Sequence, residues 1–216
     1  MIQGKSLIIW DWNGTLLDDT GVCIASMNQM LARRGMASLS KNRYRHLFRF
    51  PVQEYYVDLG FDFKQESFEL LSVEFVSLYR ELQTGACLHS GALELLELIR
   101  IKRMSQVILS AMERITLIND VTSRGINQFF DDILGVDDHY ANGKAEIARE
   151  YLSSSPVSPD EIILIGDTQH DFEVAALLGC ECILVSQGHH APDRLKATGA
   201  MVQKNLTGVL NLLINP

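Results

Sequence analysis

The sequence Leu7-Ile8-Ile9-Trp10-Asp11-Trp12-Asn13-Gly14-Thr15 joins a short apolar run to an acidic, glycine-containing segment. Apolar runs without polar alternation are typical of strands that are covered on both faces of a sheet. Asp11 stands where such a strand would end. The stretch therefore predicts a buried strand that places Asp11 at its carboxyl end.

Further strand-like runs alternate with segments of helical periodicity, such as Leu93, Leu96 and Ile99. This alternation is typical of a parallel α/β sheet. The fold class that we predict is α/β, with a Rossmann-like parallel-sheet core. The further strand-like runs cover residues 106–110, 133–134, 161–167, 182–186 and, weakly, 201–202.

The stretch from about residue 19 to residue 84 is an exception, because it contains helical patterns and no convincing strand. Two apolar stripes at helical spacing are consistent with helices that pack together. We predict an all-helical cap domain over residues 17–84, inserted into a core domain formed by residues 1–16 and 85–216. One stripe is Cys23, Met27, Met30 and Leu31, and the other is Phe68, Leu71, Phe75, Leu78 and Leu82.

The composition restricts the classes of partner. The chain has 216 residues and a formal net charge of −8, which disfavours nucleic acid and anionic membranes as partners. No apolar run approaches the roughly 20 residues that span a bilayer. Four scattered cysteines without paired spacing indicate a reducing, cytoplasmic location. We expect a monomer or a homodimer.

Polar residues gather where the predicted strands end. Asp11, Ser110 and Asp167 end three strand-like runs, Asp171 comes four residues after Asp167, and Lys144 begins a helix. In open α/β sheets, ligands bind beyond the carboxyl ends of the strands. These residues should therefore meet at one rim of the sheet.

The chemistry of this set favours phosphoryl transfer. The carboxylates of Asp11, Asp167 and Asp171 suit Mg²⁺, which prefers oxygen ligands. Asp11 can also attack phosphorus and form an aspartyl-phosphate. Ser110 and Lys144, with the backbone N–H groups after Asp11, including that of Gly14, would hold the phosphoryl oxygens.

In their order, these residues resemble the four motifs of the haloacid dehalogenase-like phosphohydrolases: Asp11-Trp12-Asn13-Gly14-Thr15, Ser110, Lys144, and Gly166-Asp167-Thr168-Gln169-His170-Asp171. The nearest branch is phosphoglycolate phosphatase-like, and the helical insertion resembles its C1 cap. The resemblance implies hydrolysis of a small phosphorylated metabolite with Mg²⁺ as cofactor. It implies Asp11 as nucleophile, and Mg²⁺ held by Asp11, the Asn13 carbonyl and Asp167, with Asp171 supporting the site.

Asn13 departs from the family pattern, which has an acid/base Asp at this position. An amide has no proton to give near neutral pH, and general acid/base catalysis contributes roughly 100- to 10,000-fold to rates. Asn13 could mark a slow phosphatase that favours good leaving groups. Alternatively, His170 or a cap residue could replace the acid/base.

Other functions are also compatible with Asn13. The phosphonoacetaldehyde hydrolase branch resembles this start and uses a cap lysine, for which Lys41 and Lys64 are the candidates here. The chain could also bind a phosphorylated ligand without turnover, or Asn13 could be an engineered change. A receiver-type signalling domain is disfavoured because Asp11 lies on the first strand.

Two further segments carry candidate residues. Arg45 and Arg49 lie in a basic, aromatic stretch of the predicted cap, and would share a helix face and meet an anionic leaving group. The alternative is a solvated face over an aromatic cap core. His189-His190 lacks spaced partner ligands, so we expect a surface loop rather than a metal site there.

Overall fold

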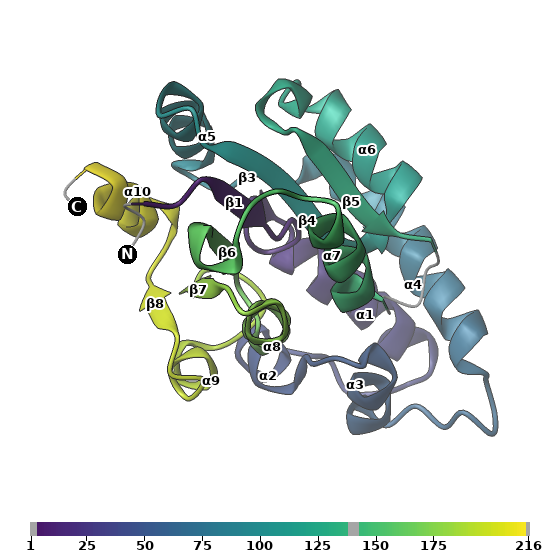
Figure 1. The fold of residues 1–216 in the computed structure, drawn as a ribbon. Coiled ribbons are helices and arrows are strands. Elements are labelled where there is room, and N and C mark those ends of the chain that lie inside the picture. The colour runs from purple at the N-terminus through teal and green to yellow at the C-terminus, as the bar shows by residue number, and fades with distance from the viewer. Residues whose placement is uncertain (1–3, 138–142, 215–216) are drawn as a thin grey trace.

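The protein is built on a six-stranded parallel sheet with the strand order β5-β4-β1-β6-β7-β8 (Figure 1). The structure is a computed structural model that describes residues 4–137 and 143–214. The fold class predicted from the sequence is confirmed. The strands are β1 (Leu7–Trp10), β4 (Ser105–Glu113), β5 (Asp132–Val136), β6 (Ile162–Gly166), β7 (Glu181–Val185) and β8 (Met201–Gln203).

Helices cover both faces of the sheet. Successive side chains of a strand point to opposite faces, and in β1 the side chains of Ile8 and Trp10 pack with α5, α6 and α10, whereas those of Leu7 and Ile9 pack with α7 and α8. Burial on both sides explains the uniformly apolar strands. The helices are α5 (Ala92–Ile101), α6 (Arg114–Ser123), α7 (Lys144–Ser153), α8 (Gln169–Leu178), α9 (Pro192–Lys196) and α10 (Leu206–Ile214).

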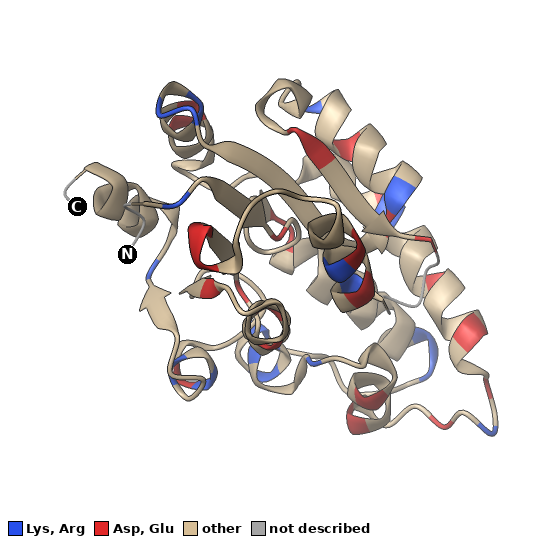
Figure 2. Cartoon of the chain, in the orientation of Figure 1, with Lys and Arg blue, Asp and Glu red and all other residues tan. Residues whose placement is uncertain are grey.

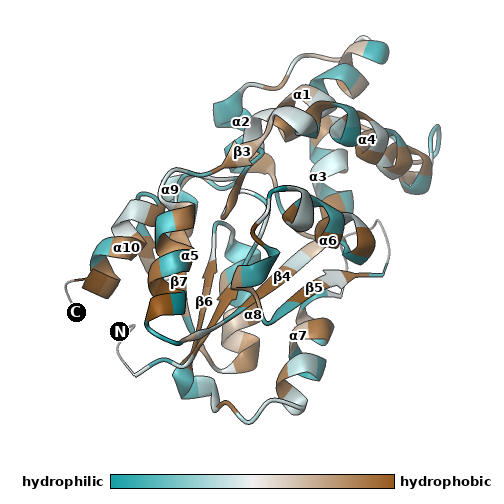
Figure 3. Ribbon diagram, turned by 90° about the horizontal axis from the view of Figure 1, so that it is seen from above, coloured by the Kyte–Doolittle hydropathy of each residue, from teal (hydrophilic) through white to brown (hydrophobic). Residues whose placement is uncertain are grey.

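The four α-helices between residues 18 and 87 form a separate layer with its own apolar core (Figure 3). Its buried side chains include Met27, Met30, Leu71 and Leu78, which belong to the two predicted stripes. The helices are α1 (Thr20–Arg33), α2 (Lys41–Leu47), α3 (Val52–Leu59) and α4 (Phe68–Leu82).

A short antiparallel ladder joins the two ends of this helical segment. β2 (Leu17–Asp18) pairs with β3 (Cys87–Leu88), so that the chain leaves the core and returns to it at neighbouring points. The predicted boundaries at residues 17 and 85 fall at or beside the ladder, and the division into two domains stays a prediction.

Two strands differ from their predicted ranges in ways that affect the site. β4 continues to Glu113, beyond the predicted end at Ser110, and its pairing with β5 shifts register between Leu109 and Glu113. Ser110 therefore lies where the regular ladder is interrupted. β6 ends at Gly166, which leaves Asp167 outside the strand.

Charged residues of both signs lie mainly on helices and connecting segments (Figure 2). Within the described residues, none of the helices combines the length and apolar character that a membrane crossing requires.

Candidate active site

Three buried carboxylates meet at the carboxyl ends of β1 and β6. Asp11 directly follows β1, Asp167 directly follows β6, and Asp171 lies in the first turn of α8. One oxygen of each carboxylate lies within 4.8 Å of the others. The adjacent parallel strands thus bring together residues that are far apart in the sequence, as the strand-end rule predicts.

Lys144, the first residue of α7, reaches into this group. Its Nζ donates hydrogen bonds to Oδ1 of Asp11 and to Oδ1 of Asp171, both at 2.6 Å. Although burial opposes the charge, the two carboxylates raise the pKa of Lys144 above its usual range. Burial and the Asp171 carboxylate raise the pKa of Asp11. Lys144 is thus fixed as an ammonium beside Asp11.

Asp171 is held from several sides. Its Oδ2 accepts hydrogen bonds from the Thr168 amide at 2.9 Å and the Thr168 hydroxyl at 2.7 Å, while Oδ1 faces Lys144. Although burial opposes the charge, Lys144 lowers the pKa of Asp171 to about 2. Because both oxygens have partners, Asp171 is suited to position Lys144 and the turn before α8.

The donor set fits a hard divalent cation. Asp11 and Asp167 are linked by the Thr15 hydroxyl, which lies 2.9 Å from Asp11 Oδ2 and 3.1 Å from Asp167 Oδ1. Burial raises the pKa of Asp167 well above its usual range. Three buried carboxylates face one lysine, so a cation of charge +2 would balance them with oxygen ligands of the kind that Mg²⁺ prefers.

Asn13, in the loop after β1, is fixed by the side chains around it. Its Nδ2 donates to Asp19 Oδ2 at 2.8 Å and lies 3.0 Å from the Tyr79 hydroxyl. The Ser110 hydroxyl lies 3.4 Å from Asn13 Oδ1. The side-chain amide therefore serves as a donor to a carboxylate.

Gly14 differs from its predicted role. Its N–H donates to Asp19 Oδ1 at 2.8 Å and to the Leu17 carbonyl at 2.9 Å, so it is not free to bind a phosphoryl oxygen. Gly14 instead permits close packing, because its φ is +76° and a Cβ there would collide with Asp167. A Cβ on Gly188 would collide with both Asp167 and the Gly14 carbonyl.

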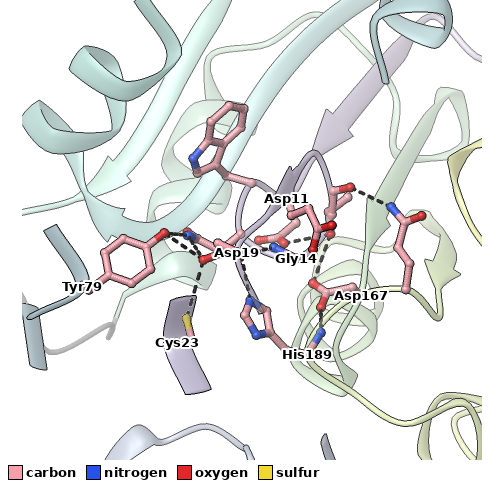
Figure 4. A network of polar contacts seen from close by, with 12 residues as sticks. Asp11, Gly14, Asp19, Cys23, Tyr79, Asp167 and His189 are labelled. Atoms are coloured by element: carbon pink, nitrogen blue, oxygen red, sulfur yellow. Dashed lines mark hydrogen bonds and ion pairs between the residues drawn. The ribbon is translucent and has the colours of Figure 1, made fainter. Parts of the chain in front are cut away.

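The prediction of a surface loop at His189 and His190 is wrong, because both side chains are buried. His189 Nε2 lies 3.3 Å from Asp19 Oδ1, and its backbone N–H donates to Asp167 Oδ2 (Figure 4). Although burial opposes the charge, Asp19 raises the pKa of His189 to about 9. In return, despite burial, His189 lowers the pKa of Asp19 to about 2.

Asp19 and His189 were missed as site residues by the sequence reasoning. The available signal was position, since His189 follows the carboxyl end of β7, on the side of the sheet where Asp11 and Asp167 lie. The residues next to Asp19 and His189 in the sequence do not indicate that these two side chains pair, because they meet only in the folded chain.

The two predicted substrate arginines have other partners. Arg45 donates to the carbonyls of Ser186 and His190, at 2.7 and 2.6 Å, and Arg49 forms ion pairs with acidic residues of α3. Arg49 also lies beyond the end of α2, so the two side chains do not share a helix face. The expectation that they meet a leaving group is not supported by these positions.

The alternative acid/base and lysine candidates lie elsewhere. Lys41 and Lys64 are exposed, and His170 packs against Phe50 with ring centroids 4.7 Å apart. Among the described residues, these three candidates are absent from the wall of the cavity that opens onto Asp11.

A cavity of about 200 Å³ lies between the strand ends and helices α1–α4. Asp11, Asn13, Ser110 and Lys144 line its polar end, and His189 also lies in its wall. The predicted catalytic residues therefore surround one space that a substrate can enter. Apart from these residues, the wall is mainly aromatic and aliphatic.

The fold and the polar cavity define a Rossmann-like α/β protein with its site at the carboxyl ends of parallel strands. The sequence profile of the haloacid dehalogenase-like hydrolases matches residues 8–185. The chain belongs to this hydrolase family.

Known proteins of similar sequence or structure include hydrolases and predicted phosphatases. A 5'-nucleotidase of Pseudomonas aeruginosa is 26% identical over 197 residues, which cover 88% of this chain and 86% of that protein. A haloacid dehalogenase-like hydrolase of Streptococcus pneumoniae superposes with a TM-score of 0.77 at 22% identity, covering 97% and 98% of the two chains. A predicted phosphoglycolate phosphatase of Haemophilus somnus gives 0.73 at 18% identity, covering 98% and 99%. The two structural likenesses show the shared fold.

Proposed function

We propose that this protein is a Mg²⁺-dependent phosphohydrolase that cleaves small phosphate monoesters through an aspartyl-phosphate on Asp11. The observation that carries the proposal is the contact of Lys144 with both Asp11 and Asp171, beside Asp167 and at the polar end of the cavity. The names of similar proteins, a 5'-nucleotidase and a predicted phosphoglycolate phosphatase, support phosphate esters as substrates.

In the first step, an Asp11 oxygen forms a bond to phosphorus while the ester P–O bond breaks and the leaving group departs as an oxyanion, which takes its proton from solvent. Lys144 and Ser110 bind the phosphoryl oxygens and balance their charge. Mg²⁺, held by Asp11, Asp167 and the Asn13 carbonyl, would supply further charge neutralisation when bound. Water then attacks the phosphoryl group, which releases phosphate and regenerates the carboxylate.

Asn13 limits the rate of this cycle for poor leaving groups. Its amide cannot protonate the leaving oxygen, and it is already a donor to Asp19. We therefore expect fast turnover only for esters whose leaving groups depart without a proton.

The cysteine pattern supports the cytoplasm as the location.

A second candidate function is binding of a phosphorylated ligand without turnover, which the fixed Asn13 amide favours. Steady-state release of inorganic phosphate separates the two functions. With Mg²⁺ and p-nitrophenyl phosphate, we expect turnover that Asp11→Asn abolishes. Rates equal to those of Asp11→Asn, together with binding of a phosphate ester, would support the binding function instead.

A further inference from the structure

The cavity beside Asp11 has an apolar outer part. Beyond its polar end, the wall comes mainly from the helical layer α1–α4 and is mainly apolar, with Ser72, Arg80, Glu113 and Thr116 as polar exceptions. The apolar wall residues include Met27, Phe48, Phe50, Val52, Phe75 and Met112.

The charged groups of the wall are already engaged. Lys144 contacts Asp11 and Asp171, and His189 is paired with Asp19. Arg80, at an exposed position, donates to the Thr116 hydroxyl at 3.1 Å, and this hydroxyl donates to the Glu113 carboxylate at 2.6 Å. Each cation of the described wall thus already faces a carboxylate, directly or through Thr116, so a carboxylate on the leaving group would have to compete with these pairs.

The volume of the cavity favours a small leaving group. The cavity has about 200 Å³ in all, and its polar end also has to hold the phosphate. An apolar cavity of about 150 Å³ binds benzene, so the space beyond the phosphate is of the order of one ring, whereas a nucleoside is larger and more polar.

We propose that the substrates are monophosphate esters of apolar hydroxyl compounds that carry one aromatic ring, with phenols turned over fastest because they leave without a proton, rather than esters of hydroxy acids, sugars or nucleosides. The inference rests on the proposed phosphohydrolase function. The phosphate occupies the polar end at Asp11, and the ring lies among the side chains of α1–α4.

The test compares benzyl phosphate with 2-phosphoglycolate, which are both esters of primary alcohols. We expect kcat/KM to be about 10- to 100-fold higher for benzyl phosphate, the range that burial of one ring supplies. Adenosine 5'-monophosphate and glucose 6-phosphate are the other arms. If any of these three polar esters equals or exceeds benzyl phosphate, the inference is overturned, while the phosphohydrolase function stands.

Two substitutions test whether the aromatic ring of the substrate lies in the cavity. Phe75→Ala should lower kcat/KM for benzyl phosphate about 10-fold and leave that for methyl phosphate unchanged. Phe63→Ala is the matched control, since Phe63 belongs to the same apolar cluster but not to the cavity wall among the described residues. Equal losses in both variants would contradict the assignment.

Binding measurements test the inference about the substrate independently of turnover. Calorimetry with Mg²⁺ should show benzylphosphonate binding at least 10-fold more tightly than phosphonoacetate, whether or not the protein hydrolyses esters. Tight benzylphosphonate binding without hydrolysis of any ester would overturn the proposed function alone. Equal or reversed affinities would overturn the inference.

Discussion

The Asn13 amide donates a hydrogen bond of 2.8 Å to the Asp19 carboxylate, in the loop that follows β1. Replacement of Asn13 by Asp would bring two carboxylates to this distance in a buried site. Asp19 also accepts from Tyr79 at 2.8 Å and pairs with His189. The residue at position 13 is thus coupled to the Asp19 carboxylate, whose charge the Asn13 amide, the Tyr79 hydroxyl and His189 stabilise together.

Asn13→Asp alone should destabilise the protein by about 1–3 kcal/mol, because a donor to a buried charged group is lost. The reciprocal double variant Asn13→Asp/Asp19→Asn restores one amide and one carboxylate and should recover part of this loss. Thermal unfolding and hydrolysis of benzyl phosphate are measured for both. A single variant as stable as the native protein would contradict the coupling.

Lys144→Met should cost about 3–5 kcal/mol of unfolding free energy, because it leaves buried carboxylates without their cation. Turnover should fall to the level of Asp11→Asn. The matched control is Lys196→Met at an exposed position of α9, which should change stability by less than about 0.5 kcal/mol. Urea unfolding in magnesium-free buffer provides the comparison. Similar unfolding midpoints for both variants would contradict the predicted role of Lys144 in stability.

The His189–Asp19 pair predicts a loss of stability at high pH. The pKa of His189 is about 9 in the folded state and about 6.5 when unfolded. Its contribution, at most about 3 kcal/mol, is fully present below pH 6.5 and is lost as the pH rises through 9. A double-mutant cycle with His189→Gln and Asp19→Asn should give a coupling energy that shrinks from pH 7 to pH 10. A coupling energy independent of pH would exclude this explanation.

Magnesium should raise the melting temperature, and its apparent affinity should weaken as the pH falls. Burial raises the pKa of Asp167, so protons compete with the cation for this carboxylate. Asp167→Asn should remove most of the shift, whereas Glu94→Gln, on an exposed position of α5, should retain it. Calorimetric titration at several pH values measures the competition. We expect magnesium binding to release protons, and proton uptake would contradict the prediction.

Gly188→Ala should impair both stability and turnover, because a Cβ there collides with Asp167 and the Gly14 carbonyl. Gly21→Ala is the control, since Gly21 lies within α1 and a Cβ there meets nothing within 4 Å. This control should stabilise the protein by about 0.5–1 kcal/mol through higher helix propensity. Melting temperatures and phosphate release distinguish the two substitutions.

Much of the architecture could be predicted from local patterns. Apolar runs without alternation predicted the buried strands, because a sheet covered on both faces requires them. The same logic predicted that Asp11 and Asp167 would share one rim of the sheet. Lys144 at the start of α7 also followed from its position.

What the sequence by itself determined is the parallel α/β fold and the identity of the strand-end residues, since both depend on periodicity and chain order. The tertiary structure decided their partners. His189 becomes buried against Asp19, Gly14 gives its N–H to the same carboxylate, and Arg45 turns to backbone carbonyls. Such contacts join segments up to 170 residues apart, and they depend on packing geometry that no local pattern encodes.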